Sequence, residues 1–382
     1  MKYRKLGRTN INVSEVSIGC EGLIDKSDEQ VQHFVDKARN MGVNFIDFYS
    51  SNPQARSAFG KAIKDHRDDW VIEGHLCSVW KNDQYLRTRK IDEVKAGFED
   101  LLERLKTDYV DVGMIHYVDS QEDFDEVFTG EVIAYALELK KQGKIKHIGL
   151  SSHNPMIARK AIETGLIDVL LFSINPCYDM LPASENVDDL WADENYEKPL
   201  TNIDSDRQAL YELCERENVA ITVMKAFGGG DLLDAQLSPF GVSMTPLQCI
   251  HYCLTRPGVV SVMAGAHTIE ELQLSTFYSD ATNEEKDYAP ILAHVPKHSF
   301  IGNCVYCGHC APCVKGIDVA SVNKFTDLCI AQGMIPETVR EHYKLLAHHA
   351  SECIACGSCV HNCPFQVDII SKMKKAVEIF GY

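Results

Sequence analysis

Residues 109–150 read YVDVGMIHYVDSQEDFDEVFTGEVIAYALELKKQGKIKHIGL, and this stretch decides how most of the chain is interpreted. Apolar runs at Tyr109–Ile115 and Ile145–Leu150 predict strands, and the amphipathic stretch Asp123–Gln142 between them predicts a helix. Two strands joined through a helix run parallel to each other. Because both runs are almost uniformly apolar, we expect a sheet that is buried on both faces and covered by helices.

The same alternation recurs on both sides of this unit. Further strands are expected at Val16–Gly19, Asn44–Phe48, Trp70–Glu73, Val169–Ser173, Ala220–Met224 and Val259–Ala264. Further helices are expected at Asp28–Met41, Gln54–His66, Arg89–Leu105, Pro155–Thr164, Ser205–Glu217, Thr245–Thr255 and Thr268–Ser279. Eight strand and helix alternations predict an α/β fold, the (β/α)8 TIM barrel, preceded by a hairpin at Lys2–Leu6 and Ile11–Ser14. An open doubly wound sheet is the alternative, but no Gly-x-Gly-x-x-Gly follows the first strand.

The connections between these elements suggest how the chain is divided. Residues 174–204 form a long acidic loop after the sixth strand, which we interpret as a lid, with a disordered insertion as the alternative. Residues 283–299 contain Pro290 and Pro296 and read as a bridging segment. We therefore expect a barrel over 1–282, a bridge over 283–299 and a small domain over 300–382.

Two cysteine runs dominate that small domain. They are Cys304-x2-Cys307-x2-Cys310-x2-Cys313 and Cys353-x2-Cys356-x2-Cys359-x3-Cys363-Pro364. The second run has the bacterial ferredoxin spacing, in which the fourth cysteine ligates the other [4Fe-4S] cluster. This predicts one cluster at Cys304, Cys307, Cys310 and Cys363, and another at Cys353, Cys356, Cys359 and Cys313.

The first run departs from the ferredoxin pattern in two ways. It has two residues before its fourth cysteine, and Val314 stands where proline is usual. Zinc sites are the alternative, since Cys-x2-Cys pairs also bind zinc. A disulfide framework is disfavoured because no signal peptide precedes the fifteen cysteines of the chain. Cys329, between the runs, reads as a small buried residue.

Composition limits the possible partners. The 382 residues carry a formal charge of -17 and 45% hydrophobic content, without an apolar run that approaches a membrane helix. We expect a cytoplasmic enzyme acting on a small molecule, without nucleic acid or membrane partners. The acidic charge fits solubility, and docking of a basic redox protein is the alternative.

Polar side chains stand where the predicted strands end. Asp47, His75 and His116 follow three neighbouring strands, and Lys225 follows the seventh. The carboxyl ends of barrel strands meet at the mouth, where barrel enzymes place their catalytic residues. We therefore expect Asp47, His75 and His116 to converge there. Lys225 holds an anionic group, forms a Schiff base or pairs with lid carboxylates.

Three segments carry a resemblance to a known family. Gly42–Asp47, Thr107–His116 and Ile148–His153 resemble the aldo-keto reductase superfamily, and the tail resembles the branch with a C-terminal ferredoxin-like domain. The resemblance implies NAD(P)H-dependent reduction of carbonyls by an Asp, Tyr, Lys and His tetrad. Asp47 and His116 match that tetrad, whereas Asn52 and His75 replace its tyrosine and lysine. The proton donor and the ammonium that lowers its pKa are thus both replaced.

The resemblance also implies a nicotinamide site, which departs from the family at several positions. Ser151 and Asn175 match, while Ser152 and Leu171 replace the residues that hold the carboxamide. Met224 replaces the aromatic residue that stacks on the nicotinamide in many members. Near Gly265, where members that prefer a 2'-phosphate carry basic side chains, this chain has Glu271, whose carboxylate is expected to repel a phosphate. Gly228, in a glycine triplet, leaves room for a pyrophosphate.

The mouth residues allow three interpretations. Asp47 and His75 form an acid-base pair, with His116 polarising the substrate and Tyr49 supplying a phenolic proton. Alternatively, the two histidines and Asp47 bind a divalent metal, or they are catalytically silent.

We predict an oxidoreductase in which two [4Fe-4S] clusters relay electrons to a substrate at the mouth. The alternatives are an NAD(P)H-dependent carbonyl reductase with accessory clusters and an electron-transfer subunit whose barrel is a docking scaffold.

Overall fold

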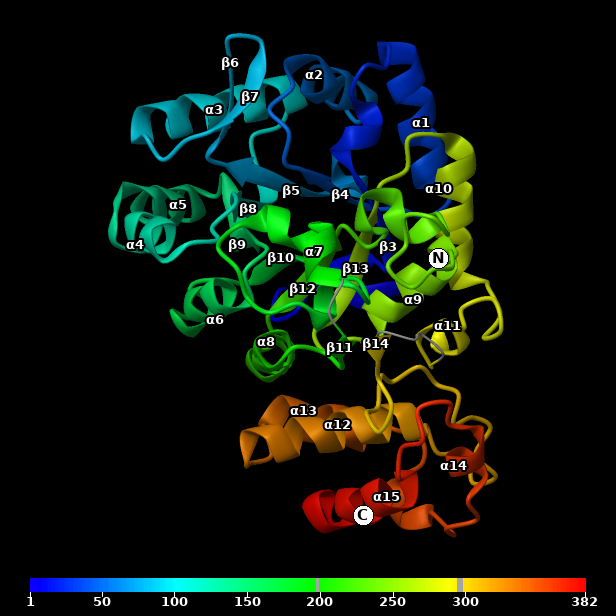
Figure 1. The fold of residues 1–382 in the computed structure, drawn as a ribbon. Coiled ribbons are helices and arrows are strands. Elements are labelled where there is room, and N and C mark those ends of the chain that lie inside the picture. The colour runs from blue at the N-terminus through cyan, green and yellow to red at the C-terminus, as the bar shows by residue number, and fades with distance from the viewer. Residues whose placement is uncertain (197–198, 294–297) are drawn as a thin grey trace.

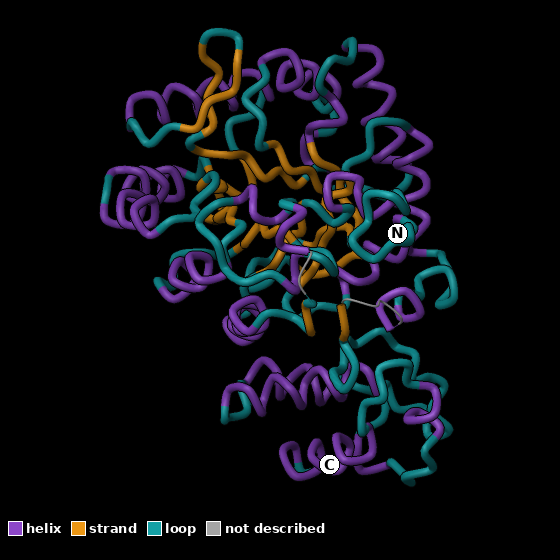
Figure 2. Tube along the Cα trace, in the orientation of Figure 1, coloured by secondary structure: helices purple, strands orange, loops and turns teal. Residues whose placement is uncertain are grey.

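Eight parallel strands close into a barrel at the centre of the computed structural model, which describes residues 1–196, 199–293 and 298–382 (Figures 1 and 2). The strands are β3 (Val16–Gly19), β4 (Phe45–Phe48), β5 (Val71–Leu76), β8 (Val110–Ile115), β9 (Ile145–Ser152), β10 (Val169–Ser173), β12 (Ala220–Met224) and β13 (Val259–Ala264). Sequence neighbours pair in order, and β13 returns to β3 to close the sheet. The predicted barrel is confirmed, and the open sheet is wrong.

Helices surround the strands on the outside of the barrel (Figure 2). They are α1 (Asp28–Asn40), α2 (Pro53–Ala62), α3 (Ile91–Leu105), α4 (Gln121–Thr129), α5 (Glu131–Gln142), α6 (Pro155–Glu163), α8 (Ser205–Glu217), α9 (Pro246–Leu254) and α10 (Ile269–Thr276). The single helix expected over Asp123–Gln142 is wrong. The chain breaks it at Gly130, where a Cβ would lie 2.2 Å from the Glu126 carbonyl oxygen.

The barrel interior is a packed core. Phe45 on β4, Val112 and Met114 on β8 and Leu171 on β10 belong to a buried cluster inside it. A Cβ at Gly149 on β9 would lie 2.1 Å from the Met114 sulfur, so glycine lets this side chain fill the centre. The tight interior fixes the strand register and, with it, the positions of the residues that follow each strand.

Three small sheets lie outside the barrel. The predicted hairpin is present as β1 (Tyr3–Lys5) and β2 (Asn12–Ser14). The other two sheets were not predicted: an antiparallel hairpin of β6 (Ser78–Lys81) and β7 (Gln84–Arg87), and a parallel pair of β11 (Leu200–Thr201) and β14 (His298–Ser299). The last pair joins the expected lid to the expected bridge. Residues 197–198 of the lid and 294–297 of the bridge lie outside the described residues.

The C-terminal part is helical and packs against one side of the barrel (Figure 1). It contains α12 (Val319–Gln332), α13 (Glu337–Lys344), α14 (Ser358–Asn362) and α15 (Ile369–Phe380). The remaining helices are α7 (Asp193–Tyr196) in the lid and α11 (Ala289–Ala293) in the bridge. Within the described residues, every helix is too short or too polar to cross a membrane. The domain boundaries stay a prediction.

Candidate functional site

The ends of β4, β5 and β8 bring Asp47, His75 and His116 together. His75 Nε2 lies 2.7 Å from Asp47 Oδ1, and His75 Nδ1 lies 2.7 Å from His116 Nδ1. His116 Nε2 lies 2.5 Å from the hydroxyl of Tyr85 on β7. These four side chains form a continuous hydrogen-bonded chain, which we call the mouth relay. The three side chains from the barrel strands are buried, whereas Tyr85 is 38% exposed.

The bonding pattern of the mouth relay allows two consistent sets of protons. In the first, an ionised Asp47 accepts from His75 Nε2–H, so the Nδ1 of a neutral His75 accepts from His116. Nε2 of His116 then accepts from the Tyr85 hydroxyl. Burial, followed by the influence of His75, holds the pKa of His116 well below its usual value, so His116 stays neutral. The reversed polarity, with Asp47 protonated and Tyr85 donating outward, satisfies every atom equally well.

Tyr85 is the site residue that the sequence reasoning missed. It lies on a hairpin whose turn residues Asn82 and Asp83 have φ of 54° and 55°, as a type I′ turn requires. An Asn-Asp pair between alternating residues was the signal available for this hairpin. It predicts the turn, although nothing in it predicts that Tyr85 reaches His116.

Tyr49 has a different place from the one expected. Its ring stacks on His116, with centroids 6.1 Å apart and planes 11° apart. Its hydroxyl donates at 2.6 Å to Oε1 of Glu21, which lies just after the end of β3. Burial is the main cause of the raised pKa of the Tyr49 phenol. Tyr49 therefore packs against the mouth relay, and its proton is committed to a carboxylate outside it.

The geometry disfavours the metal interpretation of Asp47, His75 and His116. Both ring nitrogens of His75 are hydrogen-bonded within the mouth relay, and so are both nitrogens of His116. The side chains thus form a line instead of converging on one point. In the described part of the chain, no three His, Cys, Asp or Glu side chains are arranged to hold a single metal ion.

A buried acid lies beside the mouth relay inside the barrel. Glu73 on β5 is paired in register with Asp47 on β4, and its side chain is fully buried. Glu73 Oε1 accepts from the Thr222 hydroxyl at 3.1 Å, while Oε2 has no hydrogen-bond partner among the described residues. Burial first, and then Asp47, raises the pKa of Glu73 well above its usual value. Glu73 is therefore a neutral acid.

The side chains expected at a nicotinamide are engaged within the protein. The Ser151 hydroxyl accepts from the Tyr117 amide, and the Ser152 hydroxyl donates to Asp119. Asn175 donates to the Lys225 carbonyl, and its side-chain oxygen accepts two backbone amides. With these groups committed, the residues do not fit the carboxamide-holding role that the resemblance implies.

Three further residues, Glu271, Gly265 and Gly228, were expected near a bound nucleotide. The Glu271 carboxylate accepts the amides of His267 and Thr268 and so caps α10. The 2'-phosphate position that the resemblance implies near Glu271 stays a prediction. Gly265 is exposed, and Gly228 has φ of 61° in a turn that begins at Lys225, whose carbonyl accepts from the Gly228 amide.

Lys225 contacts the lid through an aromatic ring. Its ammonium lies 5.5 Å from the centroid of the Trp191 ring, and burial lowers its pKa. The structure places this lysine under an indole instead of beside the lid carboxylates expected as its partners. The lid therefore lies close to the mouth at Lys225.

A buried network also holds the lid to the barrel. Asp179, fully buried, accepts from the hydroxyls of Tyr252 at 2.8 Å and of Tyr211, and lies 3.6 Å from Arg207. The backbone of β11 pairs with that of β14, which leads directly to Cys304. The segment over the mouth is thus connected to the segment that enters the first cysteine run.

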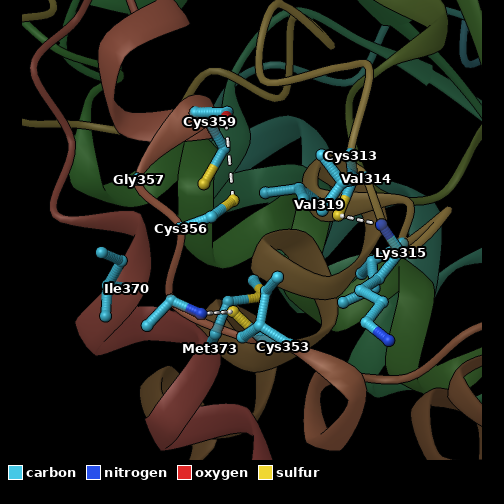
Figure 3. A pocket seen from close by; sticks show the side chains of 14 residues that line it. Cys313, Val314, Lys315, Val319, Cys353, Cys356, Gly357, Cys359, Ile370 and Met373 are labelled. Carbon is cyan, nitrogen blue, oxygen red and sulfur yellow. Dashed lines mark hydrogen bonds between the residues drawn. The ribbon is translucent and has the colours of Figure 1, made fainter.

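The cysteines surround two separate hollows in the C-terminal part. Cys313, Cys353, Cys356 and Cys359 line the first, and Figure 3 shows their sulfur atoms turned toward the same space. Cys304, Cys307, Cys310 and Cys363 line the second. These are the two sets that the crossed ferredoxin spacing predicted, although the ligand assignment itself stays a prediction.

The two cysteine runs fold in the same way. Tyr306 before Cys307 and Ala355 before Cys356 both adopt left-handed φ, 58° and 53°, and glycines with φ of 84° and 82° follow the two cysteines. Non-glycine residues adopt this conformation at a cost, so the surroundings must require it. Cys329 on α12 is buried and lines neither hollow.

Donor groups are directed at several of the sulfurs. The amides of Lys315 and Ala355 donate to the sulfurs of Cys313 and Cys353 at 3.4 Å, and the Asn323 amide donates to that of Cys304 at 3.5 Å. Hydrogen bonds to cluster sulfurs are one means by which proteins set reduction potentials.

Comparison with known proteins identifies relatives of the barrel. Residues 16–248 match the Aldo/keto reductase family, and this match ends ahead of Cys304. The uncharacterized oxidoreductase YqkF of Bacillus subtilis is 26% identical over 291 residues, which cover 72% of this chain and 89% of that protein. The NADH-specific methylglyoxal reductase of Escherichia coli is 26% identical over 190 residues, which cover 44% of this chain and 58% of that protein.

Solved structures share the fold. The holo form of the aldo-keto reductase AKR11C1 from Bacillus halodurans aligns with a TM-score of 0.58 and 21% identity, over 75% of this chain and 94% of that one. The putative aldo-keto reductase PA4992 from Pseudomonas aeruginosa aligns with a TM-score of 0.55 and 19% identity, over 72% and 93%. At these low sequence identities, the similarity shows a shared fold only.

Proposed function

This chain belongs to the aldo/keto reductase family, and from that premise we propose that it is an iron-sulfur oxidoreductase that reduces an oxygenated small molecule at the barrel mouth. The proposal rests above all on the two hollows, each lined by four cysteines from two distant stretches of the chain. The clusters, when bound, supply single electrons for that reduction.

The donor set fits two [4Fe-4S] clusters. Four thiolates face each hollow, and the remaining lining of the second is largely apolar, with Val305, Phe365, Val367 and Ile369. A [4Fe-4S] cluster would take four cysteine thiolates as ligands, which is the number that each hollow offers. Cys304, Cys307, Cys310 and Cys363 hold one cluster, and Cys313, Cys353, Cys356 and Cys359 hold the other.

The mouth relay manages the proton that the reduction consumes. Tyr85 is its outermost member and the one exposed to a bound substrate. The transfer starts from the reversed polarity of the relay, in which Asp47 is protonated and His116 Nε2–H donates to Tyr85. When the Tyr85 hydroxyl gives its proton to a substrate oxygen, His116 Nε2–H returns a proton to the phenolate oxygen. His75 then protonates His116, and Asp47 protonates His75, so that one proton leaves the inner carboxyl and one O–H bond forms on the substrate. This role for Tyr85 replaces the direct contact of His116 with substrate that we expected.

Iron analysis tests the proposal. Anaerobically purified protein is expected to contain iron and acid-labile sulfide, and dithionite is expected to bleach its visible absorbance. The Cys359→Ser and Cys363→Ser variants each remove a ligand from a different hollow, so each is expected to lose up to about half of the iron. Cys329→Ser is the matched control and is expected to keep all of it. Zinc in place of iron, or equal loss in all three variants, would refute the proposal.

An NADH-dependent carbonyl reductase is the second candidate, favoured by family membership and by the similarity to the methylglyoxal reductase. Binding of NADH to the purified protein, measured by quenching of its tryptophan fluorescence, separates the two. Ordered binding together with NADH oxidation by methylglyoxal would favour this candidate. The committed hydrogen bonds of Ser152 and Asn175 lead us to expect neither.

A further inference from the structure

Arg256 is a buried cation between the barrel and the first cysteine run. It follows α9, and its side chain is 1% exposed. Nε donates to the Tyr252 carbonyl at 3.2 Å, and Nη2 donates to the Thr255 hydroxyl at 3.0 Å and to the Val305 carbonyl. The partners of this guanidinium are thus neutral oxygen atoms.

Among the described residues, no carboxylate forms an ion pair with Arg256. Nη1 is buried and has no hydrogen-bond partner among the described residues. The carboxylate of Asp179 is reached only through Tyr252, whose hydroxyl donates to it at 2.8 Å. The other two large buried arginines differ, because Arg56 lies 3.2 Å from Asp100 and Arg207 lies 3.6 Å from Asp179. Burying a cation without a counter-charge is costly, so a missing anion is indicated.

The second hollow lies immediately beside this guanidinium. Val305, which accepts from Nη2, lines that hollow together with Cys304 and Cys307. Tyr288 donates to the same Val305 carbonyl at 2.9 Å, and the Arg256 guanidinium lies 5.4 Å from the ring centroid of Tyr306. Val305 and Tyr306, which stand between Cys304 and Cys307, therefore both contact the charged end of Arg256.

We propose that Arg256 is the counter-charge of the cluster held by Cys304, Cys307, Cys310 and Cys363, and that it raises the reduction potential of that cluster. This inference rests on the proposed function. Four thiolates outweigh the positive charge of a cubane core, so the ligated cluster is an anion that gains one further negative charge when it accepts an electron. A nearby buried cation stabilises the reduced form more than the oxidised form. Lys315 lines the hollow of Cys313, Cys353, Cys356 and Cys359, but this lysine is exposed, whereas Arg256 is buried. Solvent screens an exposed charge more than a buried one, so the two clusters differ in potential.

An anaerobic redox titration of the cluster-loaded protein, with dithionite as reductant and reduction followed by electron paramagnetic resonance, tests this inference. The Arg256→Met variant removes the charge and nearly preserves the volume. We expect its reduction equilibrium to shift at least tenfold against the reduced form of one cluster, which for a one-electron couple is about 59 mV. The other cluster is expected to keep its potential. Repeating the titration in a Cys359→Ser background assigns the shifted cluster to the hollow of Cys304.

Three variants complete the experiment. Arg207→Met removes a buried arginine that does not contact either hollow and is expected to leave both potentials unchanged. Arg256→Lys keeps a charge and is expected to shift the potential less than Arg256→Met. Should Arg256→Met fail to fold, Arg256→Gln carries the same expectation, because its amide still donates to the Val305 carbonyl.

Unchanged potentials in both neutral variants, or an equal shift of both clusters, would overturn the role of Arg256 and leave the proposed function standing. A shift in Arg256→Lys as large as in Arg256→Met would also overturn it, because charge would then not be the cause. Protein that binds no iron would instead refute the proposed function.

Discussion

Replacing Tyr85 with phenylalanine (Tyr85→Phe) removes the outermost oxygen of the mouth relay and breaks its 2.5 Å hydrogen bond to His116. Proton transfer by a positioned side chain contributes about two to four powers of ten to a rate. This corresponds to about 3 to 5 kcal/mol of activation free energy, so we expect the rate of substrate reduction to fall by that factor. The free energy of unfolding is expected to change by only about 1 kcal/mol, since one hydrogen bond of a partly exposed side chain is lost.

The assay is anaerobic reduction of a panel of aldehydes and ketones, beginning with methylglyoxal, with a reduced viologen dye as electron donor. Tyr109→Phe is the matched control, because its hydroxyl lies 3.4 Å from Asp68 at the opposite end of the barrel strands. Since the pKa of His116 lies well below its usual value, the wild-type rate is expected to stay flat from about pH 6 to 8. Equal rates for Tyr85→Phe and Tyr109→Phe would refute the proton-delivery role of the relay.

Two further predictions concern buried acids. Because the pKa of Glu73 is raised in the folded protein, its contribution to stability is complete below its unfolded pKa and is lost as pH rises. In the wild type, the free energy of unfolding is therefore expected to fall by up to about 1.4 kcal/mol per pH unit above that pKa. Glu73→Gln is expected to abolish this fall, which is measured by urea unfolding at pH 5 and 8. Burial alone would raise the pKa of Glu215, but the 2.9 Å hydrogen bond from His342 and neighbouring charges lower it to about 2. Glu215→Gln is therefore expected to cost about 3 kcal/mol at pH 7, with the difference from wild type disappearing between pH 4.5 and 2; a constant difference down to pH 2 would contradict this.

The barrel was predictable because its signal is repeated along the chain. Apolar runs such as Val169–Ser173 and Ala220–Met224 are strands at the same residues in the structure, since a strand buried on both faces has no polar positions that blur its ends. Gly130 shows the limit of this reasoning. The apolar pattern continues across it, but the Gly130 backbone is extended, with φ of -103° and ψ of -161°, and a Cβ at this position would clash with the Glu126 carbonyl oxygen.

Only the site residues at the ends of barrel strands were predictable from the sequence. Asp47, His75 and His116 meet because barrel topology places the ends of neighbouring strands together. Tyr85 lies on a hairpin outside the barrel. The orientation of this hairpin over the mouth depends on its packing, which the local sequence pattern does not predict. Asn52, at the position of the family's tyrosine, caps α2 by accepting from the Ala55 amide, so the phenol comes from another part of the chain.

The short parallel pairing of β11 with β14 bears on modularity. If the C-terminal part were a separate unit joined only by the chain, its removal would leave the structure of the barrel unchanged. Here, a chain shortened to residue 282 would leave Leu200 and Thr201 without their backbone partners, and the covering of the mouth would lose one of its anchors. The barrel and the C-terminal part therefore share a backbone seam, and an exchange of either part for that of another protein must include both sides of this seam.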